Sequence, residues 1–512
     1  MVGVPEPNCK RCSDTGRTCE GYARYPTFLI NTPEGRRRRE RLEEAKPRTP
    51  STDSPASRSD TPLARVRKPS TGDKAMVPRT DFSALPQQAS IAQLQDDQLL
   101  ACFWINYVPI GSLAQHPSPC PWLQEIMFTT DPHPALKLSL KALALTRLGW
   151  LNQDDALSKM GQSNYGLALK HIQHALWDPL AKWSDHTLAA AHLLSIYELF
   201  EATNDSVKGW NSHVSGLGLL VRLRGPDSYE SPMGQAILFG FSSGSMIHSL
   251  QFRKGTFLMS EEWKVKYFTD PVDEFHYRLL EFGFELASTL EETDRQRLQQ
   301  ELLSLDRCIS YVNMFLALDS RMEDWLQDFT SHCGDPLYVI DFKDSYCSGI
   351  PDMYKGFIFR NYRQANVLNT FWSLKLILNH ILTTIRAALG VRSAHFKTAG
   401  GPNAPAGEDR PDFLGGDRSD HCLELATNIM RAMPYVLKDE MGLLGAQQSI
   451  FPLRVALLVL KRYPGEELRW CESIYSQFNS KKGIRYATEI AKYEGGYKDD
   501  QAPTMANTIN SR

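Results

Sequence analysis

The chain has 512 residues, of which 42% are hydrophobic and 10% aromatic, and its formal net charge is −2. This is the composition of a globular protein, and it excludes a fibrous, collagen-like or wholly disordered chain. The best candidate for a membrane span, LKLSLKALALTRLGWL, is interrupted by Lys137, Lys141 and Arg147 and is shorter than the roughly 18 residues that cross a bilayer. We therefore expect no membrane partner.

Charge divides the chain into two parts. Residues 1–80 hold 17 Lys and Arg against 10 Asp and Glu, a net of +7, whereas the remaining 432 residues hold 40 against 49, a net of −9. A basic head on an acidic body is typical of an arm that binds polyanions attached to a domain that contacts proteins. A solvated basic linker gives the same count, so both interpretations stay open.

Three of the ten cysteines are clustered near the N-terminus. Cys9, Cys12 and Cys19 follow a C-x2-C-x6-C spacing. The first residues, MVGVPEP, lack the apolar run of a secretory signal, so we expect a reducing compartment, in which clustered cysteines favour a metal site over a disulfide. Three thiolates are one short of a tetrahedral zinc site. The remaining cysteines stand singly and are predicted to be small core residues: Cys102, Cys120, Cys308, Cys333, Cys347, Cys422 and Cys471.

Residues 26–88 are predicted to be a disordered basic linker. Most of this stretch lacks aromatic residues and consists of Ser, Thr, Pro and charged residues, which cannot bury enough apolar surface to fold. It contains a run of four arginines whose composition is that of a nuclear import signal or a phosphate-contacting patch, and equally of a solvated segment. These are Arg36, Arg37, Arg38 and Arg39.

From residue 89 to residue 495 apolar residues recur at intervals of three and four, with few alternating runs long enough for a sheet, which predicts an all-α domain. Within it TLAAAHLLSIYELFEA, residues 187–202, is apolar nearly all round and is predicted to be a buried helix capped by Asp185.

The next predicted helix carries Trp210 on its apolar face and ends at Gly225, where Gly and the following Pro are a typical stop signal. Gly216 and Gly218 inside this helix lower its stability relative to Ala, so we expect a neighbouring backbone to approach closely there.

Two helices are predicted towards the C-terminus. One runs through residues 362–389, and another begins at Pro452, because Pro suits the first turn of a helix. Arg454 lies on this second, apolar helix. A buried ion pair or a snorkelling side chain explains Arg454 in structural terms, and contact with a ligand or effector is the functional interpretation.

Two regions resemble fungal zinc-cluster transcription factors. PNCKRCSDTGRTCEGY resembles the second half of the Zn2Cys6 cluster, which in that family reads P-x-C-x2-C-x3-G-x2-C-x-G-Y. The body resembles the family's helical regulatory domain over about 95–490, in YELFEATNDSVKGWNSHVSGLGLLVRLRGP, LNTFWSLKLILN and GAQQSIFPLRVALLVL. The resemblance implies a nuclear, zinc-dependent transcriptional regulator of the RNA polymerase II type. His213, within the first of these body segments, is predicted to be a packing residue.

In the family's full cluster six thiolates hold two zinc ions. Cys9, Cys12 and Cys19 match the last three, so the resemblance implies two zinc ions per chain only if the missing half lies upstream. The missing half carries the basic helix that enters the major groove. The remaining basic residues are then left for phosphate contacts or nuclear import: Lys10, Arg11, Arg17, Arg36, Arg37, Arg38 and Arg39.

Two interpretations of the half cluster stay open. Either the start at Met1 is wrong and the complete protein binds DNA through a whole cluster, or the chain is a headless regulator that acts through protein–protein contacts of its helical domain. We expect transcriptional co-regulators as partners, and the sequence leaves a homodimer open. We expect salt-dependent DNA binding to separate the two interpretations, because phosphate contacts weaken steeply with salt.

An all-helical enzyme of the terpene-cyclase kind is the third hypothesis. Such enzymes need an Asp-rich metal motif, but the pairs that begin at Asp96 and Asp154 lack a third acid at the right offset. The sequence also lacks H-E-x-x-H, G-x-S-x-G and P-loop motifs. It therefore predicts no enzyme and no catalytic residue.

The predicted organisation has four parts. Residues 1–25 are a partial zinc cluster, 26–88 a disordered linker, 89–495 a helical regulatory domain and 496–512 a disordered tail.

Overall fold

The computed structural model describes residues 91–110, 118–127, 129, 131–203, 207–298, 305–341, 355–399, 418–463 and 465–492. The predicted zinc-cluster segment, the linker and the C-terminal tail lie outside these residues. The chain divides into two units, 1–94 and 95–512. Nearly all of the described residues belong to the second unit.

The described residues form fourteen α-helices and one short β-hairpin, which confirms the all-α prediction. The helices are α3 (Ile91–Tyr107), α4 (Pro121–Met127), α5 (Pro134–Asn152), α6 (Asp155–Trp177), α7 (Asp185–Glu201), α8 (Lys208–Arg224), α9 (Pro232–Phe252), α10 (Pro271–Leu298), α11 (Leu305–Cys333), α12 (Tyr362–Ala399), α13 (Ser419–Val436), α14 (Gly442–Leu460), α15 (Glu466–Lys482) and α16 (Arg485–Lys492). The hairpin pairs β1 (Tyr338–Ile340) with β2 (Phe357–Phe359) in antiparallel register.

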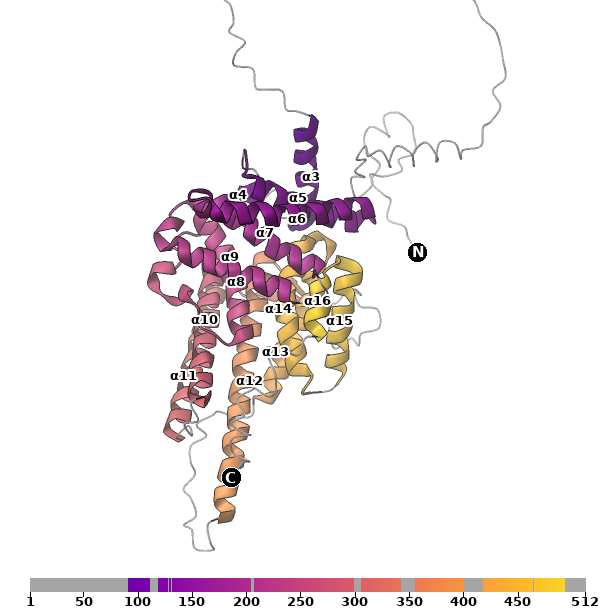
Figure 1. Cartoon of the computed structure of the whole chain (residues 1–512). Coiled ribbons are helices and arrows are strands. Elements are labelled where there is room, and N and C mark those ends of the chain that lie inside the picture. The colour runs from indigo at the N-terminus through magenta and orange to yellow at the C-terminus, as the bar shows by residue number, and fades with distance from the viewer. Residues whose placement is uncertain are drawn as a thin grey trace, which may run out of the picture. The chain divides into compact units, whose positions relative to one another are not determined.

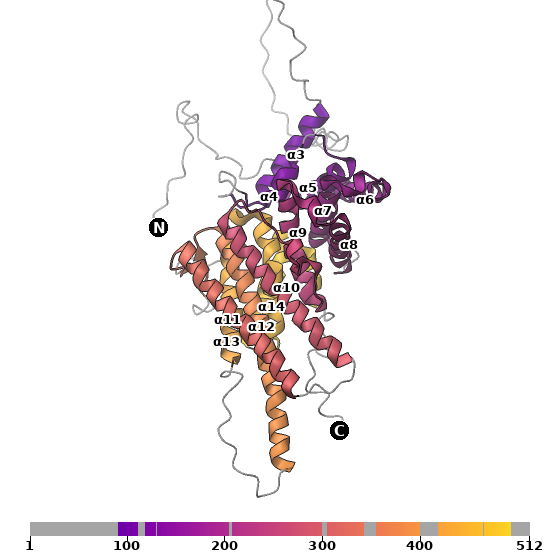
Figure 2. The ribbon, with the colours of Figure 1, turned by 90° about the vertical axis from the view of Figure 1, so that its left-hand side faces the viewer.

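Two groups of helices build the domain. In Figure 1 and Figure 2 helices α5 and α6 lie at one end, across the direction of the long helices α10, α12 and α14. Helix α7 packs against α5, α8, α9 and α16, and α12 packs against α10, α11, α13 and α14. Helices α7 and α14 are buried on most of their circumference, because they are apolar nearly all round.

Helix α14 has the composition of a membrane span. The segment Asp439–Leu460 has the length and a mean hydropathy of 1.5 that would suit a span, but 72% of its apolar window is buried inside the domain. Residues 136–151, the best candidate by sequence, lie within α5, and most of their apolar side chains are core.

A network of ion pairs joins three of the long helices. Lys375 on α12 is only 2% exposed, and it contacts Asp319 and, at 2.6 Å, Glu323 on α11. Arg418, at the start of α13, lies 2.9 Å from Asp319 and donates to the Asn379 side chain. Because a buried ammonium group must be paired to be tolerated, this network fixes how α11 and α13 seat on α12.

Three local predictions were wrong. The cap of α7 is Ser184, whose hydroxyl accepts from the Thr187 N–H, while Asp185 enters the first turn and pairs with Arg224 at 2.6 Å. Both residues are good caps, and the chain uses the one that lets the carboxylate tie α7 to α8. The ion pair between Asp185 and Arg224 therefore explains why Ser184 and not Asp185 is the cap.

The second error concerns the start of the helix before Arg454. Helix α14 begins at Gly442, ten residues before Pro452, and Pro452 lies inside it. The left-handed backbone at Gly442, with φ of 63°, starts the helix after a turn. Dense packing on all sides stabilises the helix despite the missing N–H of the proline.

The third error concerns the glycines of α8. No atom lies within 4 Å of the place where a Cβ of Gly216 would be, and Gly218 faces the Phe241 ring at 3.4 Å rather than a backbone. The end of this helix at Gly225 is as predicted.

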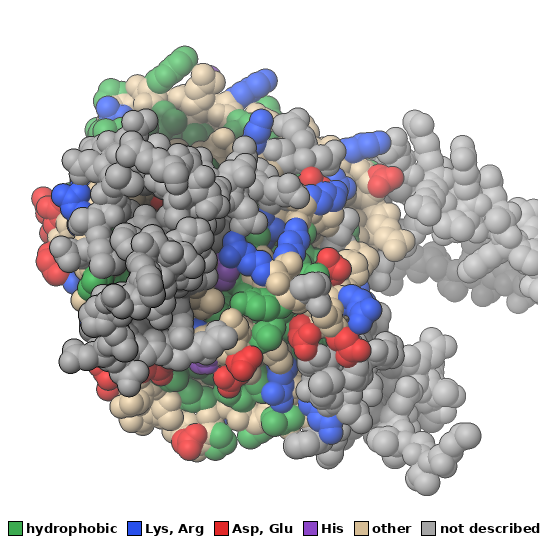
Figure 3. Space-filling view, turned by 90° about the horizontal axis from the view of Figure 1, so that it is seen from below, with side chains coloured by type: hydrophobic (Ala, Val, Ile, Leu, Met, Phe, Trp, Pro, Cys, Tyr) green, Lys and Arg blue, Asp and Glu red, His purple; other side chains and the backbone are tan. Residues whose placement is uncertain are grey.

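Acidic and basic side chains are mixed on one face of the domain. On the described part of the face in Figure 3, Lys and Arg lie interspersed with Asp and Glu around a group of hydrophobic side chains. A face of this kind lacks the single-sign basic stripe that nucleic-acid interfaces present.

Candidate functional site

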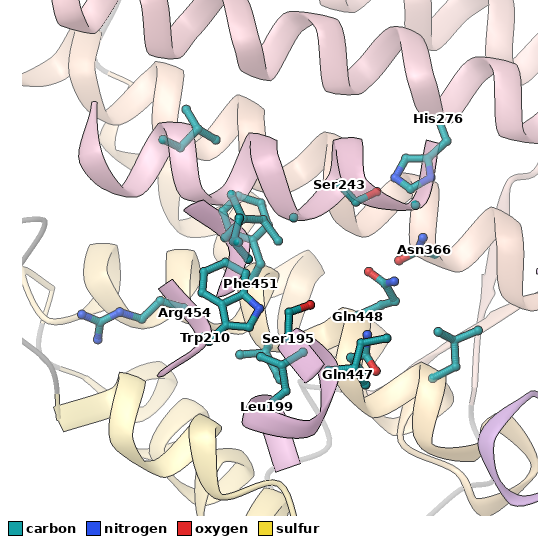
Figure 4. A pocket seen from close by; sticks show the side chains of 18 of the residues that line it. Ser195, Leu199, Trp210, Ser243, His276, Asn366, Gln447, Gln448, Phe451 and Arg454 are labelled. Atoms are coloured by element: carbon teal, nitrogen blue, oxygen red, sulfur yellow. The ribbon is translucent and has the colours of Figure 1, made fainter. Parts of the chain in front are cut away.

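A cavity of about 630 Å³ lies within the helical domain. Its walls come from helices that are far apart in sequence, namely α3, α4, α7, α8, α9, α10, α12, α14 and α16. This volume is in the range of pockets that hold drug-sized molecules. Figure 4 shows how side chains from α7, α8, α9, α10, α12 and α14 face it.

One part of the cavity is apolar. Trp210 from α8, Leu199 from α7 and Phe451 from α14 gather there in the view of Figure 4. Trp210 and Leu199 are buried core side chains that also line the cavity. An indole, a phenyl ring and aliphatic groups offer dispersion contact to a flat or chain-like apolar molecule.

Another part of the cavity is polar. Ser243 from α9, His276 from α10, Asn366 from α12 and Gln448 from α14 point towards it in Figure 4. Four helices thus each supply one neutral group that can donate or accept hydrogen bonds. Gln447 lies beside them, and its Oε1 accepts a 2.8 Å hydrogen bond from the Tyr107 hydroxyl.

Three buried histidines line the same cavity, namely His192, His276 and His380. His276 is 8% exposed and His192 is 9% exposed. Burial lowers the pKa of His276 to about 4 and that of His192 to about 3, because the imidazolium form would lose its hydration. Both rings are therefore neutral near pH 7. The His192 ring stacks on Trp122 with the ring centroids 4.1 Å apart.

The charged pair beside the polar part is already satisfied. Arg363 donates to Asp273 at 3.1 Å through Nε and also contacts the Ser118 carbonyl at 2.5 Å. Burial raises the pKa of Asp273 to about 6, and Arg363 opposes that rise. The carboxylate and the guanidinium neutralise each other next to the cavity.

Arg454 lines the cavity, as the functional interpretation of this residue requires. In Figure 4 its guanidinium lies away from the four polar groups, and Nη1 donates to the Ala491 carbonyl at 3.4 Å. The side chain is half-buried. Arg454 thus makes a hydrogen bond within the domain and also lies at the cavity wall.

A second cluster involves His213. The Tyr165 hydroxyl lies 3.1 Å from His213 Nε2 and donates a 2.6 Å hydrogen bond to Glu198, which is 1% exposed. Glu198 also accepts from the hydroxyl and the N–H of Thr203. These contacts tie α6, α7 and α8 to one another, so the cluster is structural and His213 packs within it.

Gly209 is the glycine of α8 that a close contact requires. A Cβ at Gly209 would lie 2.2 Å from Glu198 Oε2. The segment from Tyr197 to Pro226, which resembles the family's regulatory domain, therefore contains both the buried Glu198 carboxylate and the glycine that leaves space for it.

The predicted metal, phosphate-contact and import residues all lie outside the described residues. They are Cys9, Cys12, Cys19, Lys10, Arg11, Arg17, Arg36, Arg37, Arg38 and Arg39. Within the part of the chain that the structure describes, no group of three or more His, Cys, Asp or Glu side chains could hold a metal ion.

Most of the single cysteines are buried or half-buried. Cys120, Cys308, Cys422 and Cys471 are buried, Cys102 and Cys333 are half-buried, and Cys347 lies outside the described residues.

Asp96 pairs with Lys137 and Lys141, and Asp154 caps α6 through the N–H groups of Ala156 and Leu157.

Comparison with family models identifies a region of this domain. Residues 98–279 match the fungal specific transcription factor domain. The matched stretch runs from α3 into α10 and contains the Glu198 cluster and part of the cavity wall. This is a family of transcription factor domains and not of enzymes, and no zinc-cluster domain was detected.

Among curated proteins, the chain is similar to an uncharacterized protein of Emericella nidulans. The two are 27% identical over 126 residues, which is 25% of this chain and 27% of that protein. The chain thus matches only about a quarter of the length of this relative. No solved structure matches.

The cavity residues were largely missed by the sequence analysis. His192, His276 and Asn366 occur in helices of different sequence regions, with no shared motif or spacing. Only tertiary packing brings them to one cavity. Arg454 was the one lining residue that an unusual position, a charge on an apolar helix, could identify beforehand.

Proposed function

We propose that this chain is a fungal transcriptional regulator that acts in the nucleus. The observation that carries the proposal is the match of residues 98–279 to the fungal specific transcription factor domain. The helical domain is the regulatory part, and it controls activity through partners or ligands rather than through chemistry.

The finer proposal is that the regulator binds DNA with the help of zinc. The donor set fits in part: Cys9, Cys12 and Cys19 offer three thiolates, and a tetrahedral zinc site needs a fourth ligand. In a Zn2Cys6 arrangement a bridging thiolate from the other half of the cluster would be that fourth ligand. Bound zinc would supply the folding energy of such a small module.

Basic residues of the same region would add phosphate contacts. They set affinity and not the choice of sequence. They are Lys10, Arg11, Arg17, Arg36, Arg37, Arg38 and Arg39.

A second candidate is a regulator that docks on other factors without touching DNA. Exposed apolar side chains at the end of α6 and around the 3-10 turn η3 (Ala181–Trp183) favour it. Trp177 is 76% exposed and Leu180 is 86% exposed, and Leu176 and Trp183 lie beside them in sequence. Clustered exposed aromatic and aliphatic side chains are typical of protein-binding surfaces.

Crosslinking of the tagged full chain to chromatin in a fungal host tests the proposal. We expect enrichment of promoter fragments that is lost in Cys9→Ala and retained in Cys102→Ala, a half-buried cysteine outside the cluster. Enrichment that survives Cys9→Ala supports the second candidate. A chain that enriches no promoter fragment overturns both.

A further inference from the structure

The polar part of the cavity holds four groups whose hydrogen-bonding capacity the domain does not use. In the described part of the chain, the side chains of Ser243, His276, Asn366 and Gln448 line the cavity, and none of them hydrogen-bonds to another protein group. Buried polar groups are normally paired, because an unpaired donor or acceptor carries its full desolvation cost. Of the four residues His276 is buried, whereas Ser243, Asn366 and Gln448 are half-buried at the cavity. One buried imidazole without a partner, beside three half-buried polar groups from other helices, indicates that the cavity takes a polar partner.

His276 is the strongest evidence for such a partner. It is more than nine-tenths buried, and Figure 4 shows its imidazole directed towards Ser243 and Asn366 at the cavity. His192 adds a second ring on the wall, with an Nδ1 that has no hydrogen-bond partner among the described residues. Each neutral imidazole offers one donor and one acceptor.

The charge of the polar part favours a neutral partner there. The cavity is also lined by Arg454, Lys461 and Arg462, and Figure 4 shows Arg454 away from the four polar groups. The four unpaired groups are uncharged near pH 7, and the adjacent carboxylate of Asp273 is held by Arg363 at 3.1 Å. An anionic head placed there would lie near Asp273 and would have to compete with it for Arg363. A cationic head would have to compete with Arg363 for Asp273. Both would also lose their hydration in a buried site.

The apolar part of the cavity determines what the rest of the bound molecule should be. Trp210, Leu199 and Phe451 surround it with rings and aliphatic groups, and about 630 Å³ is room for a drug-sized compound. The two parts face one continuous cavity, so a single molecule can fill both.

We propose that this cavity binds a neutral, mainly apolar small molecule that carries hydroxyl, carbonyl or amide groups at one end. Its oxygen-bearing end lies among Ser243, His276, Asn366 and Gln448, and its hydrocarbon or aromatic body lies against Trp210 and Phe451. The proposal goes beyond the proposed function, because binding depends on the cavity and not on transcription.

Fluorescence titration of the purified full chain with Nile red, a neutral dye that brightens in apolar surroundings, is the first test. We expect saturable binding to one site. Dodecanol and dodecanoate then compete with the dye, since they share a chain length and differ in head-group charge. We expect dodecanol to displace the dye at about tenfold lower concentration than dodecanoate.

Two variants locate the site. Ser243→Phe fills the polar part and is expected to abolish saturable dye binding, whereas Ser163→Phe on the exposed face of α6 is expected to leave it unchanged. Gln448→Met keeps the size of the side chain and is expected to weaken displacement by dodecanol about two- to tenfold, the effect of one neutral hydrogen bond. If Ser243→Phe fails to fold by circular dichroism, Gln448→Met decides the question.

Three results would overturn the proposal. They are the absence of saturable dye binding to the folded chain, equal displacement by dodecanol in wild type and Gln448→Met, and stronger displacement by dodecanoate than by dodecanol. None of these results bears on promoter occupancy, so failure here is distinguishable from failure of the proposed function.

Discussion

The Arg147 guanidinium on α5 donates a 2.8 Å hydrogen bond to the carbonyl of Gly483, which lies 336 residues later, just after the end of α15. A second bond of 2.7 Å reaches the Lys482 carbonyl. The guanidinium also lies over the Phe200 ring, 4.4 Å from its centroid, and the side chain is fully buried. Arg147 thus ties the start of the domain to its C-terminal helices.

Removal of this tie should destabilise the whole domain. Arg147→Leu leaves two buried carbonyls unpaired, so we expect the free energy of unfolding to fall by about 2–4 kcal/mol. Urea denaturation followed by circular dichroism measures it. Arg469→Leu, at a side chain that is 77% exposed, is the matched control and should change little. Equal stabilities of the two variants would show that the tie is unimportant.

Gly209 and Glu198 should behave as a coupled pair. Gly209→Ala places a Cβ against the Glu198 carboxylate, so we expect a loss of about 2 kcal/mol or more in the free energy of unfolding. In a Glu198→Ala background the same change should cost much less, because the obstructing atoms are gone. A double-mutant cycle measures the coupling.

The control for this pair is Gly166→Ala on α6, where no atom lies within 4 Å of the added Cβ. That change should be neutral or slightly stabilising. Additive effects of Gly209→Ala and Glu198→Ala would contradict the close contact.

Substitution of the buried Lys375 should lower the stability of the domain far more than substitution of a surface lysine. Lys375→Ala leaves Glu323 and part of the Asp319 carboxylate unpaired, so we expect a loss of about 3–5 kcal/mol in the free energy of unfolding. Thermal unfolding monitors the change. Lys492→Ala, whose partner Glu489 lies one helical turn away at the surface, should cost well under 1 kcal/mol. A mild effect of Lys375→Ala would show that solvent reaches the network.

Acid should destabilise the domain through its cavity histidines. In the folded chain the pKa of His276 is about 4, against about 6.5 for an unperturbed histidine. Below pH 6.5 the unfolded chain therefore binds more protons than the folded one. The contribution of His276 to stability is constant above pH 6.5 and falls as pH is lowered towards 4.

The Asp273 carboxyl, whose pKa burial raises to about 6, changes stability in the opposite direction between pH 6 and 4. The comparison must therefore be made between wild type and His276→Asn rather than from wild type alone. We expect wild type to lose about 1–3 kcal/mol more than the variant between pH 7 and 4.5 in urea titrations. Parallel stability profiles would contradict a buried neutral His276.

The sequence predicted the helical architecture, and the fourteen α-helices of the described residues confirm it. It located the end of α8 at Gly225 and the apolar face that includes Trp210. It failed where two local signals competed. Ser184 and Asp185 are both good caps, and only the distant Arg224 shows which is used.

The cavity lay beyond local sequence reasoning. Its polar groups come from α9, α10, α12 and α14, and nothing in the spacing of Ser243, His276, Asn366 and Gln448 indicates that they meet. Their lack of partners among the described residues is a property of the packed domain. The N-terminal cysteines are the opposite case. Their spacing alone predicts a metal site, and they lie outside the described residues.

Regulation of transcription by the helical domain is tested most directly with a tethered reporter. The full chain is fused to the DNA-binding domain of a bacterial repressor and expressed in a fungal host that carries the matching operator upstream of a reporter gene. We predict a several-fold change in reporter transcript relative to the bacterial domain alone. An unchanged reporter, with the fusion shown to be folded and present in the nucleus, would contradict a regulatory role of the helical domain.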